Sequence, residues 1–507
     1  MFRKISHTEG VKDDAEILFS TAFDYMFPDA ARSRPCLLPD TVATHHGLRA
    51  LGKLMADTGA PGSPQASLDS TTPAAFTYLG QFIDHDITAR TDRDETVSIL
   101  GRGEPVGRLD PDEVVAKLRN GRRPQLDLDS VFGEGPGLAG SAVPATTQSQ
   151  ILYDGAYRLQ LFQSGSRVDL PRRVTVDLEG NTSYPAVIAD ARNDENLNVS
   201  QLHAAFLRFY NAVRDVQTGG DKARYVRARQ LVRWAYQYVV VHDYLPAVCD
   251  PDIVADTLAN GPRFIGSTAG RGDAFMPLEF STAAFRFGHS MIRPFYRVNA
   301  ASGDLTILQI LGTSANAANF DSADHQLLDT RIIDWRNYVG SSAQRARKID
   351  TKIAHDLFTL PFRPDDPILT NLAQSNLFRG YNLSIPTGQA ICDAFGVTPM
   401  HPHTEILAGE DPGIVDVLKE AYFHHRTPLW YYILREAAVQ QGGERLGEVG
   451  SRLVSETIIG LLKQDPNSFL NNHHDKAVKD NGIDVKPGAG GVINELSDIL
   501  TFAGFTV

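Results

Sequence analysis

Four polar side chains interrupt an otherwise apolar segment at residues 77–86, namely Gln81, Asp84, His85 and Asp86. On a helix the first three occupy positions i, i+3 and i+4, so they share one face. A lone histidine there is most simply a buried, hydrogen-bonded residue, but three polar groups on one buried face need partners. Because a neutral imidazole can take up and return a proton near neutral pH, His85 is a candidate for acid–base chemistry.

Three further polar motifs follow in the chain. They are Ala189-Asp190-Ala191-Arg192-Asn193-Asp194-Glu195-Asn196, Phe285-Arg286-Phe287-Gly288-His289-Ser290 and Ser375-Asn376-Leu377-Phe378-Arg379-Gly380. Together with the segment 77–86, and in the same order, they resemble the motifs of the animal-type haem peroxidases, the peroxidase–cyclooxygenase superfamily. The matches run from about residue 74 to about residue 463, and four ordered motifs are more specific than one. The chain looks like a bacterial member of that family.

The resemblance implies that His85, Arg192 and Gln81 form the catalytic side of a haem site. Splitting the O–O bond of hydrogen peroxide needs a base that moves a proton between the two oxygens, which suits His85. The leaving oxygen gains negative charge, and a fixed cation such as Arg192 stabilises it in the transition state. Gln81 is expected to order water or halide near His85. A surface ion pair of Arg192 with a neighbouring carboxylate is the alternative.

The opposite side of the haem is assigned to His289 and Asn376. An imidazole that binds iron needs its second nitrogen held by a partner, and the resemblance gives His289 that partner in Asn376. Arg286 and Arg379 resemble the arginines that meet the haem propionates, where bidentate pairing favours arginine. Charged residues on exposed helix faces are the alternative for both arginines.

Two carboxylates match the residues that become ester-linked to haem methyl groups in animal members of the family. These are Asp84 and Glu195, so haem b with two ester links is the hypothesis for the cofactor. Asn196 stands where the best-known halide-oxidising member has a methionine. The third, sulfonium-type link is therefore absent, and with it much of the case for chloride oxidation.

Asp86 resembles a calcium ligand whose partners come from a loop matched here by residues 123–133. The resemblance assigns Arg123, Gln125, Asp127 and Asp129 as the other ligands of a Ca²⁺ ion. Carboxylate and carbonyl oxygens are the ligands that calcium selects. The family usually has threonine and serine as first and last ligands of the loop, so Arg123 can offer only its carbonyl, while Asp129 adds a charge.

The residue three positions before the proximal histidine separates branches of the superfamily. Fatty-acid dioxygenases and cyclooxygenases have a radical-forming tyrosine there, and this chain has Arg286. We therefore predict a haem peroxidase that reduces hydrogen peroxide through a ferryl species and oxidises iodide, bromide, thiocyanate or phenols. Two alternatives stay open: a fatty-acid dioxygenase, for which Tyr296 is the nearest substitute tyrosine, and a non-catalytic haem-binding or adhesion protein.

Composition limits the other classes of function. The 507 residues carry a net charge of -12 and a pI of about 5.7, without a long basic run, which disfavours nucleic acid and anionic membranes as partners. The first residues lack the pattern of a secretory signal, so we expect a cytoplasmic protein or one exported by another route. Three widely spaced cysteines disfavour a disulfide framework. The oligomeric state is not predicted.

Helical periodicity dominates the chain, and the fold class that it predicts is mainly α, arranged around a buried haem, with few short strands. We expect a single domain over residues 1–507. Helices are expected around 46–57, 202–213, 221–248, 427–439 and 446–463, strands around 158–163 and 173–178, and surface excursions at 98–145 and 464–491. The glycine clusters at 101–103 and 133–137 are interpreted as turns. Paired histidines, such as His424-His425, show no spacing typical of zinc ligands.

Overall fold

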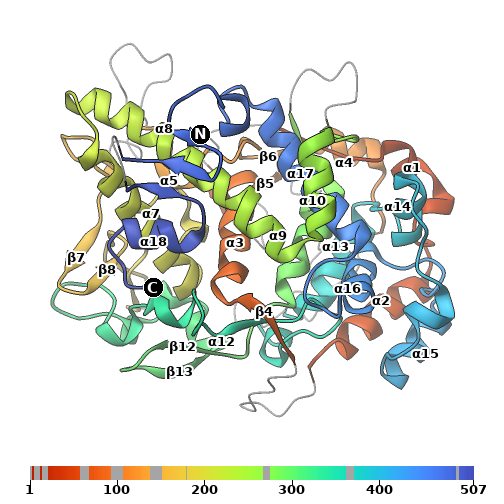
Figure 1. Ribbon diagram of the computed structural model, residues 1–507. Helices are drawn as coiled ribbons and strands as arrows, with labels where there is room; N and C mark the ends of the chain where they lie inside the picture. The colour runs from red at the N-terminus through yellow and green to blue at the C-terminus, as the bar shows by residue number, and fades with distance from the viewer. Residues whose placement is uncertain are drawn as a thin grey trace.

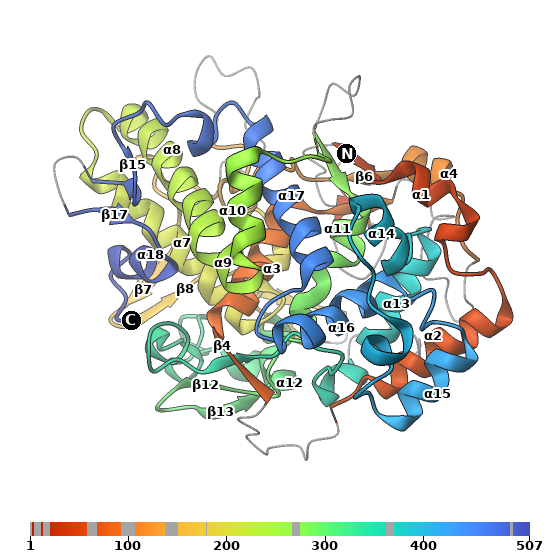
Figure 2. The ribbon, with the colours of Figure 1, turned by 45° about the vertical axis from the view of Figure 1, so that its right-hand side comes forward.

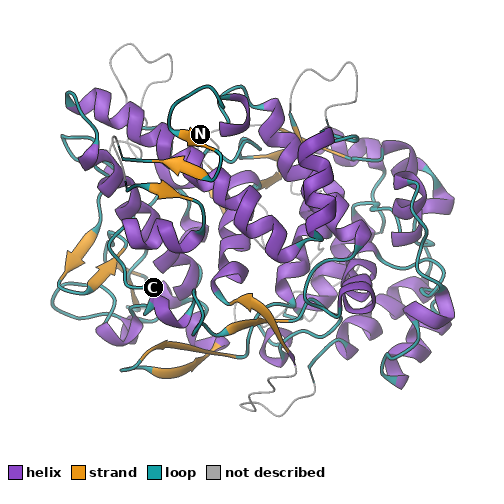
Figure 3. Cartoon of the chain, viewed as in Figure 1, coloured by secondary structure: helices purple, strands orange, loops and turns teal. Residues whose placement is uncertain are grey.

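The computed structural model describes residues 21–57, 68–92, 107–136, 151–265 except 179, 274–360, 370–486 and 490–507, with two short strands at 3–4 and 12–13. Helices dominate this part of the chain (Figure 3). Buried apolar side chains from nearly all of the helices join into one contiguous core. The expectation of a mainly α fold is confirmed.

The helices surround a central one, α3, which runs through the middle of the molecule in two views (Figures 1 and 2). The α-helices are α1 (Pro28–Arg32), α2 (Val42–Leu54), α3 (Ala75–Ile87), α4 (Pro111–Lys117), α5 (Asp129–Phe132), α7 (Leu197–Val216), α8 (Asp221–Val239), α9 (Leu245–Val248), α10 (Pro251–Asn260), α11 (Leu278–Thr282), α12 (Ile307–Ile310), α13 (Leu372–Asn382), α14 (Gly388–Phe395), α15 (Pro412–Glu420), α16 (Leu429–Gln441), α17 (Glu448–Gln464) and α18 (Leu496–Phe502). Four shorter helical turns matter for the site: η4 (Ala191–Asp194), η5 (Val240–Tyr244), η6 (Ala284–His289) and η12 (Pro402–Ile406).

Short strands lie at the margins of this helical body (Figure 3). One sheet has the order β11 (Phe275–Pro277), β3 (Thr21–Asp24), β6 (Leu118–Asn120) and β5 (Arg90–Asp92). The others are β1 (Arg3–Lys4) with β2 (Lys12–Asp13), β4 (Asp69–Pro73) with β14 (Arg345–Arg347), β7 (Phe162–Ser164) with β8 (Arg167–Asp169), β9 (Thr175–Val176) with β10 (Thr182–Ser183), β12 (Phe295–Asn299) with β13 (Gly303–Thr306), and β16 (Gly482–Asp484) between β15 (Val478–Lys479) and β17 (Val492–Ile493).

The position of α3 depends on close packing on two sides. It packs against α7 on one side and against η6 on another. Gly80 faces Tyr244 so closely that a Cβ atom at this position would lie 2.4 Å from the tyrosine hydroxyl. Only glycine leaves room for that approach, so a larger residue would push α3 away from the η5 turn.

The helices expected from the sequence are present with shifted ends. The segment 46–57 corresponds to α2, 202–213 to α7, 221–248 to α8, η5 and α9 in succession, 427–439 to α16, and 446–463 to α17. The strand expected at 158–163 begins only at Phe162, and the one at 173–178 shrinks to β9. Among the described helices none is long and apolar enough to cross a membrane.

The expectation of surface excursions is wrong for much of two segments. Leu126 and Phe132 are fully buried, as are Ile483 and Val485 near the C-terminus. In the first of these segments the polar and glycine-rich sequence forms a buried loop, and its backbone enters the left-handed region at Leu128, where φ is 57°. The glycine cluster at 133–136 does form a turn; the one at 101–103 lies outside the described residues. A single domain over the whole chain stays a prediction.

Candidate haem site

His85 lies on α3 and is completely buried. Its Nδ1 is 2.8 Å from Oδ1 of Asn193, and Nδ2 of Asn193 is 2.9 Å from Nδ1 of His203. Because a carbonyl oxygen can only accept, Nδ1 of His85 carries the proton and Nε2 holds the lone pair. Burial lowers the pKa of His85 to about 3, and the nearby Arg192 adds to this effect. The ring is therefore a neutral base, as the sequence predicts.

Arg192 lies on η4 beside the same histidine. Its Nη2 donates to the carbonyl oxygen of His85 at 2.7 Å and to Oδ2 of Asp190 at 2.7 Å. Burial opposes ionisation of Asp190, but Arg122 and Arg192 outweigh it and hold the pKa of Asp190 well below its usual range. The surface ion pair weighed as an alternative is wrong, because Arg192 and Asp190 are 5% and 2% exposed.

Arg122 is a residue of this network that the sequence analysis missed. One of its Nη atoms pairs with Asp190, and the other lies 3.1 Å from Oδ1 of Asp129. It therefore connects the carboxylate beside Arg192 to the loop that follows β6. Asn193 was missed in the same way. Nothing in the local sequence distinguishes either residue from an ordinary surface side chain, because their partners lie far away along the chain.

Gln81 and Glu195 meet on the other side of His85. Nε2 of Gln81 donates to Oε1 of Glu195, and Nδ2 of Asn196 donates to Oε1 of Gln81 at 3.0 Å. Oε1 of Glu195 lies 3.7 Å from Nε2 of His85. Burial raises the pKa of Glu195 to about 8, although Arg192 opposes the shift. Glu195 is thus largely protonated at neutral pH.

Several of these side chains keep accessible surface. One third of the Glu195 side chain is accessible, and Gln81 and Asp84 on α3 are half-buried. Asp84 accepts from the Thr88 hydroxyl at 2.7 Å. Carboxylates that would react with a bound haem must keep accessible surface, and Asp84 and Glu195 meet that requirement.

His289 closes η6, the turn that packs against α3. The amide of Asn376 on α13 lies 2.8 Å from its Nδ1, and rotation of that amide places its oxygen there as an acceptor. Burial lowers the pKa of His289 to about 3, and Arg286 and Arg379 add to the effect. A neutral ring with Nδ1 held by an amide leaves Nε2 as a metal-binding atom.

Arg286 and Arg379, which the resemblance assigns to the haem propionates, lie close enough to His289 to lower its pKa. Arg379 is only 7% exposed, so an exposed helix face is wrong for this residue. Arg286 is half-buried; its Nε donates to the carbonyl oxygen of Ser281 at 3.0 Å, and its own carbonyl accepts from the Trp430 indole at 3.1 Å. Two arginines near this imidazole are suited to bind the carboxylates of a ligand that the imidazole itself would hold.

Asp86, Asp127 and Asp129 form a buried cluster whose ligand atoms lie within 4.8 Å of one another. Burial raises the pKa of Asp86 to about 7, and Asp127 adds to it. Oδ2 of Asp129 has no hydrogen-bond partner within the described part of the chain. A hard cation fits this donor set, because it would bind that oxygen and offset the repulsion among the three carboxylates.

The two remaining loop residues contribute less than the resemblance implies. Nη1 of Arg123 lies 3.9 Å from Oδ2 of Asp127, so its guanidinium approaches the acidic cluster as a cation. Its carbonyl accepts from the Gln125 amide at 2.9 Å. The carbonyl of Gln125 receives a long contact from Gln237, at 3.5 Å. The structure thus brings three of the five assigned calcium ligands together as carboxylates, while Arg123 can contribute only its backbone oxygen.

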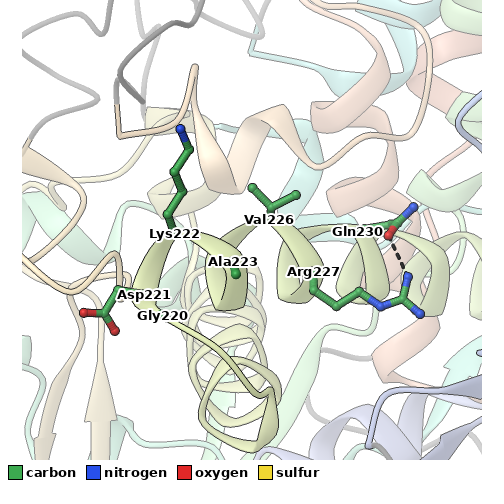
Figure 4. A pocket seen from close by; sticks show the side chains of 7 residues that line it. All are labelled: Gly220, Asp221, Lys222, Ala223, Val226, Arg227 and Gln230. Atoms are coloured by element: carbon green, nitrogen blue, oxygen red, sulfur yellow. Dashed lines mark hydrogen bonds between the residues drawn. The ribbon is translucent and has the colours of Figure 1, made fainter.

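A separate open depression lies along the start of α8, lined by Gly220, Asp221, Lys222, Ala223, Val226, Arg227 and Gln230 (Figure 4). Its side chains point in different directions, and Arg227 donates to Gln230 at 2.7 Å instead of facing the depression. Without converging polar groups it has none of the features of a catalytic site.

The chain is similar to several curated proteins over part of its length. Matching curated proteins include Drosophila melanogaster dual oxidase, 25% identical over 246 residues, Dictyostelium discoideum peroxinectin A, 26% over 241, and human thyroid peroxidase, 28% over 194. These matches cover 46%, 46% and 35% of this chain, but only 15%, 41% and 20% of those longer proteins.

Solved structures extend the likeness to the whole fold. Peroxidase A of Dictyostelium discoideum superposes with a TM-score of 0.61 at 16% identity, covering 100% of this chain and 99% of that one. The fatty acid alpha-dioxygenase of Oryza sativa gives a TM-score of 0.59 at 14% identity, over 95% and 79% of the two chains.

The family model described as animal haem peroxidase matches residues 147–479, about two thirds of the chain. The match includes Arg192, His289 and Asn376, whereas α3 and the acidic cluster lie before it. The motif order, the helical fold around α3 and this match agree, and the chain belongs to the animal haem peroxidase family.

Proposed function

We propose that this protein is a haem peroxidase that reduces hydrogen peroxide and oxidises small donors such as iodide, bromide, thiocyanate or phenols. The observation that carries the proposal is the pair of neutral histidines, His85 buried on α3 and His289 half-buried on η6, on elements packed against each other. Haem, when bound, supplies the redox chemistry at iron. His289, supported by Asn376, would hold it, and Arg286 and Arg379 would meet its propionates.

The side chains around His85 supply the proton transfers. With its Nδ1 proton held by Asn193, His85 can accept a proton at Nε2 from a peroxide and return it to the departing oxygen. Arg192 adds positive charge beside that path, which favours the developing negative charge on the departing oxygen. Gln81, fixed between Glu195 and Asn196, keeps the Glu195 carboxyl within 3.7 Å of His85.

Asp84 and Glu195 are proposed to form ester links to the haem. Both carboxylates keep accessible surface and lie close enough for the charge of Asp84 to raise the pKa of Glu195. After repeated exposure to peroxide, haem should remain with the denatured protein when it is extracted with acidified acetone. The double variant Asp84→Asn, Glu195→Gln should release its haem, and full release from the wild-type protein would rule out the links.

Calcium is proposed for the cluster of Asp86, Asp127 and Asp129. Because Asp86 directly follows His85, an ion there would help to fix the end of α3. Chelation should lower peroxidase turnover by about tenfold, within the range typical for supporting shells, and calcium should restore it. The Asp127→Asn variant should have low turnover, and restoring it should need a higher calcium concentration than the wild-type protein needs. Turnover that is indifferent to both changes would refute this role.

The competing function is that of the structural neighbours, the fatty acid alpha-dioxygenases. Against it stands Arg286, three residues before His289, flanked by Phe285 and Phe287, none of which can form a phenoxyl radical. Tyr296, the nearest substitute, is fully buried and its hydroxyl accepts from the Arg293 amide at 3.0 Å. The non-catalytic haem-binding or adhesion protein considered from the sequence is the further alternative.

The experiment compares three readouts on the haem-loaded protein: iodide or phenol oxidation driven by peroxide, oxygen uptake with palmitic acid, and the haem absorption spectrum. We expect donor oxidation without oxygen uptake. His85→Ala should retain haem and lose about 10²- to 10⁴-fold in turnover. His203→Gln, one hydrogen bond further along the same relay, should lose less than about tenfold and serves as the control. Oxygen uptake with palmitate would establish the dioxygenase, and a spectrum unchanged by peroxide would favour the non-catalytic role.

A further inference from the structure

Three imidazoles from two separate segments meet at the edge of the molecule near α15. His403 belongs to η12, while His424 and His425 lie in the turn between α15 and α16. The ring centroids of His403 lie 5.6 Å from His424 and 6.1 Å from His425, and the last two are 4.3 Å apart. One nitrogen from each ring lies within 4.8 Å of the others. The fold thus assembles a group that the sequence spacing does not indicate.

The hydrogen bonds of the cluster leave lone pairs in suitable places. Nδ1 of His424 lies 3.0 Å from the carbonyl oxygen of Leu418, so Nδ1 carries the proton and Nε2 has a lone pair. A histidine fixed through one nitrogen by a backbone carbonyl is the usual arrangement of a metal ligand. The ring of His425 stacks on that of Tyr422, with centroids 4.7 Å apart, and this contact holds it beside His424.

We propose that His403, His424 and His425 bind a divalent transition-metal ion, with zinc as the best match. Imidazole nitrogens select zinc, nickel or copper over calcium or magnesium. Tetrahedral zinc with bonds of about 2.0–2.1 Å places its ligand nitrogens about 3.4 Å apart. The ligand nitrogens therefore need to approach one another by at most about 1.4 Å, and the exposed side chain of His403 can move by that much.

The fourth position of this site is assigned to water. His401 lies nearby, with its ring 6.1 Å from that of His403. Its Nδ1 accepts from the backbone amides of His403 and Thr404, both at 3.3 Å, so its proton is on Nε2. His401 is thus arranged to donate a hydrogen bond to a bound water and not to bind the metal. Three protein ligands and a water would pin η12 against the turn before α16.

The chain provides a matched control in its other exposed histidine pair, His473 and His474. Their rings lie 6.1 Å apart, and among the described residues no third histidine, cysteine or carboxylate comes close enough to complete a metal site with them. The proposed metal cluster lies beside α15, at the edge of the molecule, whereas α3 runs through its middle (Figures 1 and 2). The site is therefore separate from the haem chemistry, and the proposal does not depend on the proposed function.

The test is calorimetric titration of zinc into the haem-loaded protein in millimolar calcium, which occupies the acidic cluster, followed by zinc K-edge absorption spectroscopy. We expect one zinc per chain and a first shell with imidazole scattering. His403→Ala, a change at an exposed side chain, should weaken binding at least tenfold, and the double variant His473→Ala, His474→Ala should bind as the wild type does. Undiminished binding by His403→Ala, a shell of oxygen alone, or no saturable binding would overturn the proposal.

Discussion

The two sides of the candidate haem site use the same residue type in different surroundings. His85 is buried and His289 half-buried, and the pKa of each is lowered to about 3. Each ring is held at Nδ1 by an asparagine, Asn193 for His85 and Asn376 for His289. The nearby charges differ: Arg192 beside His85 is ion-paired with Asp190, which also pairs with Arg122, whereas two arginines, Arg286 and Arg379, lower the pKa of His289. In the proposed function, the ring that moves protons thus lies beside a cation fixed by a buried ion pair, and the ring that holds the metal lies near two arginines suited to carboxylates of the same ligand. The surrounding charges, more than the histidine or its asparagine partner, distinguish the two proposed roles.

The largest effect is expected from His289→Ala. Because His289 would hold the haem iron in the proposed function, haem should bind this variant more than about 100-fold more weakly, beyond the loss typical of supporting residues. The measurement is a haem titration that follows the Soret band, with free imidazole added to the variant. Imidazole should restore part of the spectrum, because it can occupy the space left by the side chain. Unchanged haem affinity would show that another residue holds the iron, and the comparison between His85 and His289 would then fail.

Asp190→Asn tests the buried ion pairs beside His85. The substitution leaves the guanidinium groups of Arg122 and Arg192 without a carboxylate between them, at a site that is 2% exposed. Breaking a buried ion pair on one side costs about 3–5 kcal/mol, and we expect a loss of that size in the free energy of unfolding measured with urea at pH 7.

Two control variants sharpen this prediction. Asp112→Asn breaks the surface pair with Arg32, whose partners are 40% and 71% exposed, and should cost less than about 1 kcal/mol. Asn376→Ala removes a neutral hydrogen bond and should cost about 1 kcal/mol. Equal losses for Asp190→Asn and Asn376→Ala would mean that the two sides of the site do not differ in the way proposed.

Local patterns were sufficient to predict the residues that act through their own segment. The i, i+3, i+4 spacing of Gln81, Asp84 and His85 predicts both the helix and its polar face, because helical periodicity depends only on nearby residues. The motif around His289 likewise predicts which ring faces the site. The assignments of Asp86, Asp127 and Asp129 to one cluster also hold, since the resemblance supplies the long-range pairing that periodicity cannot.

Residues whose role depends on distant partners could not be predicted. Arg122 finds Asp190 68 positions away, and Asn193 finds His85 108 positions away. Their burial follows from packing between elements, which no local pattern encodes. The histidines near α15 illustrate the same limit, since His403 meets His424 and His425 only after η12 and α16 pack together. The sequence predicts a surface excursion over the buried residues 126–132, because polar residues that hydrogen-bond to one another look the same in sequence as polar residues in water.

The smallest effect is expected from the pH dependence of stability contributed by His203, the last member of the relay from His85. Burial lowers its pKa to about 3 in the folded protein, while an unfolded histidine titrates near ~6.5. As the pH falls below about 6.5 the unfolded chain binds a proton that the folded protein refuses, so stability falls toward acid. Between pH 7 and pH 5 this linkage removes about 2 kcal/mol. His203→Gln lacks the titrating group, so urea unfolding should show a shallower loss for the variant by that amount. Parallel pH profiles for the two proteins would mean that His203 takes up its proton at the same pH in the folded and unfolded states, so that burial does not hold this ring neutral.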